Sequence, residues 1–136
     1  MRTGTERTGA ANGFTLLELI VVMTLIGLLV GIALPAYRDA TQRAREATLR
    51  EDLHRMREAI DEYQTDKSEY PPALEDLVIA GYLRSLPKDP ITGSDSTWVV
   101  EYAPWEMVDQ GKIAGVFNVR SGAEGDGLDG TPYAQW

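Results

Sequence analysis

The feature that most constrains this chain is an apolar run of 23 residues near its N-terminus, from Phe14 to Ala36. As an α-helix the run would be about 34 Å long, which matches the roughly 30 Å hydrocarbon core of a lipid bilayer. A buried helix of a soluble protein is a poor alternative, because the 100 residues that follow could hardly cover a helix that is apolar on every face. The run therefore predicts a membrane-spanning segment.

A cleaved secretory signal peptide is a second alternative for this run. Such peptides have a basic start, an apolar stretch of about 7–15 residues and a small-residue cleavage site after it. Here the run is longer, no cationic residue directly precedes it, and residues 33–36, Ala-Leu-Pro-Ala, make a poor cleavage site. We therefore expect the run to be retained in the mature protein.

One charged residue, Glu18, interrupts the run, and it is the only charged residue between Arg7 and Arg38. A carboxylate at the centre of a membrane helix costs about 2.5–3.5 kcal/mol on insertion scales, and less near the helix end. Such a residue usually marks a function and needs a partner. If the chain began at Phe14, its α-amino group would lie four residues from Glu18, and a neighbouring copy could offer the same amine.

The composition excludes several classes of function. The formal net charge is −8, which repels phosphate backbones, so nucleic acid is not an expected partner. The chain has no cysteine, which rules out disulfides, thiol catalysis and cysteine-based zinc sites. His54 is the only histidine, and it is expected to lie on the surface or at the edge of a helix's apolar face. No nucleophile elbow or phosphate-binding glycine loop is present, so an enzyme is not expected.

Beyond Pro35 the sequence becomes amphipathic and predicts that the helix continues to about Asp66. Apolar side chains recur at steps of four, three, four and three residues, which places them on one face of a helix. Charged residues occupy the other faces, with i,i+4 pairs such as Glu51 and Arg55 that support an exposed helix. The apolar face consists of Leu49, Leu53, Met56, Ile60 and Tyr63.

The remaining residues predict a short helix and two strands. Pro71 and Pro72 end the long helix, and residues 72–77 suit a short helix with Pro72 in its first turn. Residues 96–104 and 112–121 are rich in β-branched and aromatic side chains, which is typical of strands. An antiparallel pair packed on the amphipathic helix is the simplest core, and it gives an α+β fold.

The start of the chain also resembles a known superfamily. A short polar leader ends in Gly13, and Phe-Thr-Leu-Leu-Glu and the apolar run follow it directly. This order resembles the class III signal of type IV pilins and pseudopilins. The resemblance implies that a prepilin peptidase cuts between Gly13 and Phe14 and that Phe14 is N-methylated. It also implies that Glu18 pairs with the amine of an adjacent subunit during assembly, and that Pro35 breaks or kinks the long helix.

The same resemblance divides the chain into three parts. Residues 1–13 would be the cleaved leader, residues 14–36 the membrane-spanning and polymerising half of the helix, and residues 37–136 a periplasmic head that includes the amphipathic half. The implied fold is α+β and type IV pilin-like, with a long kinked N-terminal helix packed on a small antiparallel sheet and a C-terminal loop.

Later parts of the chain resemble one branch of the superfamily, the major pseudopilins of type II secretion systems. The resemblance lies in residues 70–94, with their Leu-Pro-Lys-Asp-Pro loop, and in the Gly/Asp-rich tail that ends in Trp136. The chain also lacks the C-terminal cysteine pair common in true type IV pilins. Residues 97–112 match the branch only loosely, and the tail has Ala-Glu-Gly where the branch more often has Ala-Asp-Gly.

For such a chain the resemblance implies a structural subunit and not an enzyme. It would polymerise with itself into a pseudopilus that helps to drive folded proteins across the outer membrane. Implied partners are the prepilin peptidase, minor pseudopilins, the inner-membrane assembly platform and the lipid bilayer. The subunit would span the inner membrane once, with its head in the periplasm, and enter a periplasmic filament on assembly. Two alternatives stay open: a major or minor pilin of a type IV pilus (motility, adhesion or DNA uptake), and a membrane-anchored binding domain that does not polymerise.

The C-terminal segment from Ser121 to Trp136 holds three carboxylates among several glycines. On these residues alone, a solvated acidic loop is the simpler interpretation, because the spacing does not match an EF-hand. Major pseudopilins, however, bind calcium in this loop, and the resemblance therefore implies a calcium site here as well. The implied ligands are Glu124, Asp126 and Asp129, with Ser121 and the Leu128 carbonyl as supplements.

Overall fold

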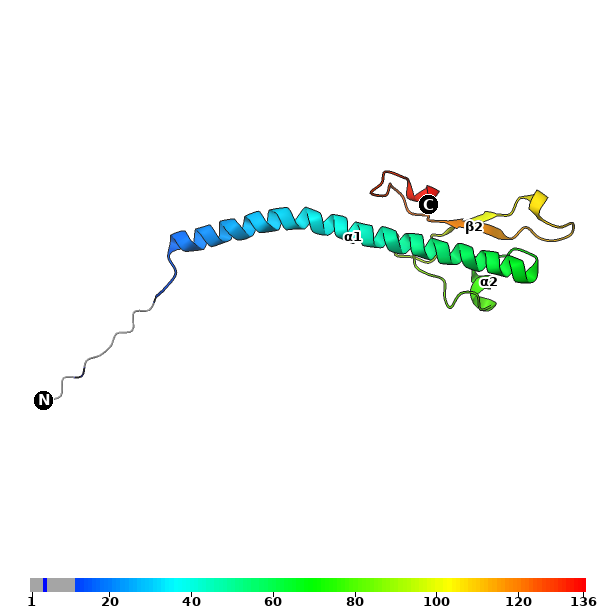
Figure 1. The fold of residues 1–136 in the computed structure, drawn as a ribbon, viewed down its shortest axis with the longest axis horizontal. Helices are drawn as coiled ribbons and strands as arrows, with labels where there is room; N and C mark the ends of the chain where they lie inside the picture. Colours follow the sequence, from blue (N-terminus) through cyan, green and yellow to red (C-terminus); the bar gives the residue numbers. More distant parts are fainter. Residues whose placement is uncertain (1–3, 5–11) are drawn as a thin grey trace. The chain divides into compact units, whose positions relative to one another are not determined.

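The computed structural model describes residue 4 and residues 12–136, and its elements give the α+β class that the sequence predicts (Figure 1). The chain divides between Arg38 and Asp39 into two units, which are described separately. The elements in chain order are α1 (Leu16–Lys67), α2 (Leu74–Ile79), β1 (Val99–Tyr102), the short 3₁₀ helix η1 (Trp105–Met107), β2 (Val116–Arg120) and the 3₁₀ helix η2 (Tyr133–Gln135).

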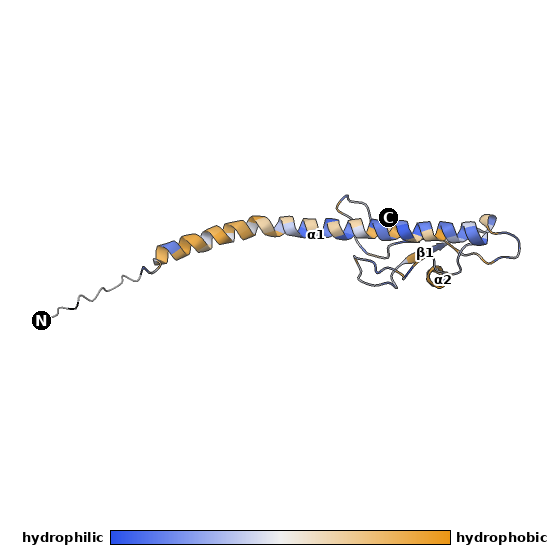
Figure 2. Ribbon diagram, turned by 60° about the horizontal axis from the view of Figure 1, so that its bottom comes forward, coloured by the Kyte–Doolittle hydropathy of each residue, from blue (hydrophilic) through white to orange (hydrophobic). Residues whose placement is uncertain are grey.

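The first unit contains the apolar half of α1, which appears as the orange part of the helix in Figure 2. Thr15 caps its N-terminus: the Thr15 hydroxyl accepts the Glu18 N–H at 3.1 Å, and the Thr15 carbonyl accepts the Leu19 N–H at 3.1 Å. The helix is not interrupted at Pro35, so the break that the resemblance allowed is not observed. Proline has no N–H, and the carbonyl of Gly31 therefore loses its intrahelical donor while α1 continues.

The second unit is built on the amphipathic half of α1. The predicted apolar face is confirmed, because Leu49, Leu53, Met56 and Ile60 are at most 2% exposed and Tyr63 packs against them, half-buried. Burying such side chains is the main favourable term in folding, worth about 1.5–3 kcal/mol each. The face therefore provides the surface on which the rest of the head packs.

Strands β1 and β2 form the predicted antiparallel pair, with Val99 opposite Arg120 and a bulge between Glu101 and Tyr102. Val116 and Val119 of β2 are fully buried in the core cluster that includes the α1 face. On the other side of the ladder, Arg120 pairs with Glu101 at 2.9 Å. The pair therefore has one face in the core and one face that carries charge.

Helix α2 begins later than the sequence predicts. Ala73 occupies its N-cap position with an extended backbone, so Pro72 lies before the helix and not in its first turn. The reason is local: the Asp76 carboxylate accepts the Ala73 N–H at 2.9 Å and fixes the start of the helix there. Leu74 and Leu77 join the core, and Gly81, with φ of 87°, follows the helix.

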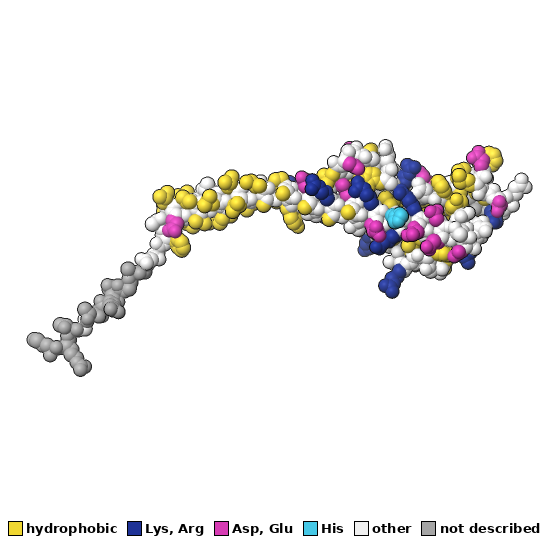
Figure 3. All heavy atoms as spheres, viewed as in Figure 1, with side chains coloured by type: hydrophobic (Ala, Val, Ile, Leu, Met, Phe, Trp, Pro, Cys, Tyr) yellow, Lys and Arg dark blue, Asp and Glu magenta, His cyan; other side chains and the backbone are white. Residues whose placement is uncertain are grey.

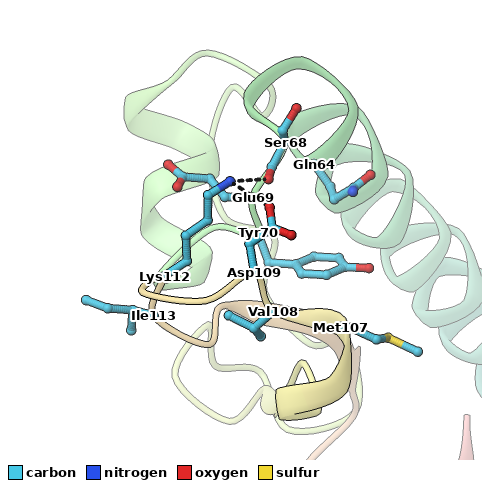
Figure 4. A pocket seen from close by; sticks show the side chains of 9 residues that line it. All are labelled: Gln64, Ser68, Glu69, Tyr70, Met107, Val108, Asp109, Lys112 and Ile113. Atoms are coloured by element: carbon cyan, nitrogen blue, oxygen red, sulfur yellow. Dashed lines mark hydrogen bonds and ion pairs between the residues drawn. The ribbon is translucent and has the colours of Figure 1, made fainter.

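The chain between the two strands lies beside the C-terminal end of α1 (Figure 4). Lys112 reaches across to this end, where its ammonium donates to the Ser68 carbonyl at 2.9 Å and pairs with the Asp109 carboxylate at 3.3 Å. Ser68 itself has φ of 56°, a left-handed conformation that ends α1. The strand-joining segment is thus fastened to the helix end.

Candidate functional site

The predicted cleavage site lies in exposed, non-helical backbone. Gly13 and Phe14 both precede α1, and the Phe14 side chain is 86% exposed. Apart from Gly13 itself and its two chain neighbours, no atom of the described residues lies within 4 Å of the position that a Cβ would take at Gly13, so the described fold gives no reason for a glycine there. Exposed irregular backbone is the form that proteases cleave most readily. Most of the predicted leader, residues 1–3 and 5–11, lies outside the described residues.

Glu18 lies in the first turn of α1, three residues after the Thr15 cap. A carboxylate there is favourable for two local reasons, because it suits the positive end of the helix dipole and has the spacing of a capping box. Within the described residues, however, no cation and no N–H donor contacts the Glu18 carboxylate. The N-terminal turn of α1 therefore tolerates the Glu18 carboxylate, but the described residues provide no group that binds it.

The apolar half of α1 is uncovered. Its most apolar stretch has no buried residue, and the helix is long and apolar enough to cross a membrane. Figure 3 shows hydrophobic side chains along the visible face of this half. Thr24 satisfies its own hydroxyl by donating to the Ile20 carbonyl at 2.8 Å, as polar side chains in lipid-facing helices commonly do. This surface needs an apolar environment that the described chain does not supply.

Two of the predicted calcium ligands already serve other contacts. The Ser121 hydroxyl donates to the fully buried Asp89 carboxylate at 2.5 Å and accepts the Ala123 N–H at 3.1 Å. The Asp129 carboxylate accepts the Thr131 N–H at 2.9 Å, and its other oxygen lies 3.4 Å from a guanidinium nitrogen of α1. The backbone hydrogen bond from Thr131 is the main cause that lowers the pKa of Asp129, followed in the same direction by its hydroxyl contact and the guanidinium.

The structure does not bring the three predicted carboxylate ligands together. Glu124 and Asp126 are exposed, and Leu128 contributes its N–H to a contact with α1. Among the described residues, no group of three acidic or histidine side chains is close enough to hold a metal ion. Calcium needs about 6–8 oxygen ligands directed at one centre. The residues present do not fit that requirement, and calcium binding stays a prediction from resemblance.

Side chains of α1 hold this C-terminal segment instead. Glu46 is 3% exposed, and its Oε1 accepts the Leu128 N–H and the Tyr133 hydroxyl at 2.9 Å each, and the Gln42 side-chain amide at 3.1 Å. Burial is the main cause that raises the pKa of Tyr133, which keeps its hydroxyl protonated as a donor. One turn further along the helix, the Arg50 guanidinium lies 4.1 Å from the centre of the Trp136 ring.

Arg57 makes the third contact between α1 and the C-terminal segment. Its guanidinium donates to the Val119 carbonyl at 2.9 Å, the Trp136 carbonyl at 2.8 Å and the Asn118 side chain at 3.0 Å. Desolvation by burial is the main cause that lowers the pKa of Arg57, and the neighbouring Arg120 adds to it. The lowered pKa reflects the partial removal of the Arg57 guanidinium from water by the groups that it contacts.

Two buried carboxylates, Glu46 and Asp89, were not predicted from the sequence. Glu46 continues the apolar face of α1 three residues before Leu49, so its position on the buried side could have been read from the periodicity. Asp89 precedes Pro90 in a loop, where aspartate commonly accepts backbone N–H groups two and three residues on. It does so here, from Ile91 and Thr92.

The N-terminal part of the chain matches the family model of the prokaryotic N-terminal methylation motif, over residues 9–34. The chain is 32% identical to the type II secretion system core protein G of Vibrio cholerae over 137 residues, which covers 87% of this chain and 88% of that protein. The protein of the same name from Klebsiella pneumoniae is 35% identical over 100 residues, which covers 62% of this chain and 71% of that protein.

A fimbrial protein of Neisseria meningitidis is 39% identical over 60 residues, but this likeness covers only 44% of the chain and 35% of that protein. No solved structure matches the chain significantly. The similarity that extends through the head is therefore to the secretion proteins. The match to the methylation motif covers only residues 9–34, which include the start of α1. The chain belongs to the type II secretion system core protein G family.

Proposed function

We propose that this chain is a structural subunit of the type II secretion pseudopilus, which polymerises through its N-terminal helix to help drive folded proteins across the outer membrane. The observation that carries the proposal is the uncovered apolar half of α1, at whose start the Glu18 carboxylate has no partner among the described residues. The family is a structural one, and the proposed work is mechanical, so the chain supplies a polymer interface and no catalytic group.

The uncovered half of α1 would be surrounded first by lipid and later, in the filament, by other subunits. Before assembly, lipid would cover it, and the subunit would span the inner membrane once with its head in the periplasm. In the filament, the same surface would pack against helices of other copies. Gly27 and Gly31 lie four residues apart on one face, and a Cβ added at either would meet no described atom within 4 Å beyond the adjacent backbone of the helix. Such small-residue pairs allow close approach of a second helix.

Glu18 would supply register in that filament. A carboxylate that the local fold leaves without a partner is stabilised when an adjacent subunit offers a cation, and cleavage between Gly13 and Phe14 would create one at the new N-terminus. Phe14 and Glu18 are only four residues apart in the chain. In two neighbouring copies, the amine of Phe14 in one could therefore face the carboxylate of Glu18 in the other. Prepilin peptidase, minor pseudopilins and the assembly platform are the proposed further partners.

The stretch from Gly27 to Pro35 is intrinsically the weakest part of α1. Two glycines and one proline lower helix propensity by about 5 kcal/mol relative to alanine. Neighbouring contacts must compensate for this deficit, and they change when the helix leaves lipid. We therefore propose that α1 partly unwinds here during assembly, with Pro35 at the end of the unwound stretch.

The first test is the intact mass and N-terminal sequence of the protein from native membranes. The proposal predicts a chain that begins at N-methylated Phe14. A chain that still begins at Met1, or that is cut after Ala36, would contradict it. A secretion defect on deletion, without loss of surface filaments, would then separate the pseudopilus from a type IV pilus.

The second test replaces Glu18 by leucine. Glu18→Leu should still insert and be cleaved, but should fail to form filaments, because the amine of the neighbour loses its partner. Thr24→Leu is the matched control: it removes the only polar side chain between Glu18 and Ala36 without changing charge, and should assemble normally. Filaments counted by electron microscopy after overexpression give the readout. Normal filaments from Glu18→Leu would contradict the proposed role of Glu18 in assembly. Absence of filaments from the wild-type chain would favour the anchored domain that does not polymerise.

A further inference from the structure

Three charged side chains on one face of α1 hold the C-terminal segment, residues 121–136. Glu46, Arg50 and Arg57 are spaced by four and seven residues, which keeps them on the same side of the helix. We propose that these three residues, the helix clamp, fix the C-terminal segment on the head without a divalent cation. The clamp would thus do in this chain the structural work for which the family resemblance implied calcium.

The polarity of the loop carries this proposal. A calcium loop directs carbonyl and carboxylate oxygens toward a positive centre. Here the loop directs donors, the Leu128 N–H and the Tyr133 hydroxyl, toward one oxygen of the buried Glu46 carboxylate. A buried charge needs such donors to compensate for its lost hydration. The segment is therefore arranged around a negative group that belongs to the helix.

Arg50 supplies the positive charge on the exposed side of the loop. Its guanidinium pairs with Asp129 and stacks on Trp136, whose ring lies 5.1 Å from that of Tyr133 in an edge-to-face arrangement. Asp129, one of the predicted calcium ligands, thus already has a cation from the protein. The contact between the two rings thus joins Trp136, which Arg50 covers, to Tyr133, which donates to Glu46.

Arg57 is the third residue of the helix clamp, and it contacts Trp136. It joins the Trp136 carbonyl to the Val119 carbonyl of β2, so the end of the chain and the strand share one donor. The loop also satisfies its own backbone: the Gly127 N–H donates to the Thr131 carbonyl, and the Tyr133 N–H donates to the Gly125 carbonyl. These contacts order a glycine-rich segment by protein groups alone.

The test is hydrogen exchange of peptides from residues 121–136, measured on the full chain in detergent micelles with either EDTA or calcium chloride. The proposal expects equal protection of these peptides in both buffers. It also expects Glu46→Ala to raise their exchange rates about tenfold or more in either buffer, since the Leu128 and Tyr133 donors lose their acceptor. Because one subunit suffices, the result does not depend on the proposed assembly into a pseudopilus.

Matched variants make the comparison specific. Glu51→Ala removes an exposed carboxylate from the same helix, whose only described ion pair is with Arg55, and should leave exchange in the loop unchanged. The double variant Glu124→Ala, Asp126→Ala removes two predicted calcium ligands and should also leave it unchanged. If Glu46→Ala fails to fold, Arg50→Met keeps an apolar stem against Trp136 and should still loosen the loop.

Two results would overturn the proposal. The first is that peptides from residues 121–136 lose protection in EDTA and regain it in calcium, and that the Glu124, Asp126 double variant shows the same loss. The loop would then depend on a metal. The second is unchanged protection in both Glu46→Ala and Arg50→Met, since the clamp would then not hold the segment.

Discussion

Asp89 provides the sharpest test of how the head is held together. It lies in the loop that joins α2 to β1, and its carboxylate is fully buried. Oδ1 accepts the Ile91 N–H at 2.8 Å and the Thr92 N–H at 3.3 Å. Its Oδ2 accepts the Ser121 hydroxyl at 2.5 Å, which connects this loop to the C-terminal segment. Asp89→Ala should therefore destabilise both loops at once, because three donors lose their acceptor.

The magnitude follows from those three donors. A buried donor without an acceptor costs about 1–3 kcal/mol. Thr92 is exposed and water can replace its long bond, so the N–H of Ile91 and the hydroxyl of Ser121 carry the effect. We expect a loss of about 3 kcal/mol, or about 12–24 °C in Tm for a domain of about 100 residues. Asp89→Asn keeps an acceptor at Oδ1 and offers an N–H to Ser121, so it should cost only about 1 kcal/mol.

Urea unfolding of the full chain in micelles, followed by tryptophan fluorescence, measures this loss. Trp98 is a suitable probe, because its indole N–H donates to the Pro87 carbonyl at 2.8 Å, beside the Asp89 loop. Asp95→Ala, an exposed aspartate of the same loop, is the control and should change stability by less than about 0.5 kcal/mol. An Asp89→Ala variant as stable as this control, or an Asp89→Asn variant as unstable as Asp89→Ala, would refute the proposed role of the Asp89 carboxylate.

Three further predictions concern the head. Leu53→Ala should cost about 2–5 kcal/mol in urea unfolding because Leu53 is 2% exposed, whereas Ile79→Ala, 82% exposed, should cost little. Gly122→Ala should cost about 1–3 kcal/mol in the same assay, because an added Cβ would overlap the Thr97 carbonyl oxygen; wild-type stability would show that the backbone there can move. A backbone hydrogen bond holds the pKa of Asp129 below its ordinary 3.8, so its stabilising effect is complete above pH 3.8 and is lost as the pH falls through the lowered value. Thermal unfolding from pH 6 to pH 2 should show this loss, and Asp129→Asn should remove that part of the pH dependence.

The sequence by itself determined the features that depend on local periodicity. The helix over the apolar run and the amphipathic face from Leu49 to Tyr63 follow from where apolar side chains occur along the chain. The two strands follow from local content of β-branched and aromatic residues, and the structure confirms all three elements. The charge of Glu18 within the run also follows directly from the sequence. Such features need no knowledge of distant residues, because each helical turn or strand positions its own side chains.

Only the tertiary structure decided which partner each polar group takes. The acidic residues of the C-terminal loop look alike in sequence, and the prediction treated all three carboxylates as available to a metal. In the folded head, Asp129 lies beside Arg50, and Ser121 donates to Asp89. These contacts join residues far apart in the chain, so no local pattern encodes them. They form because burial brings the loop against α1, and each buried donor or acceptor then requires the nearest group of opposite polarity.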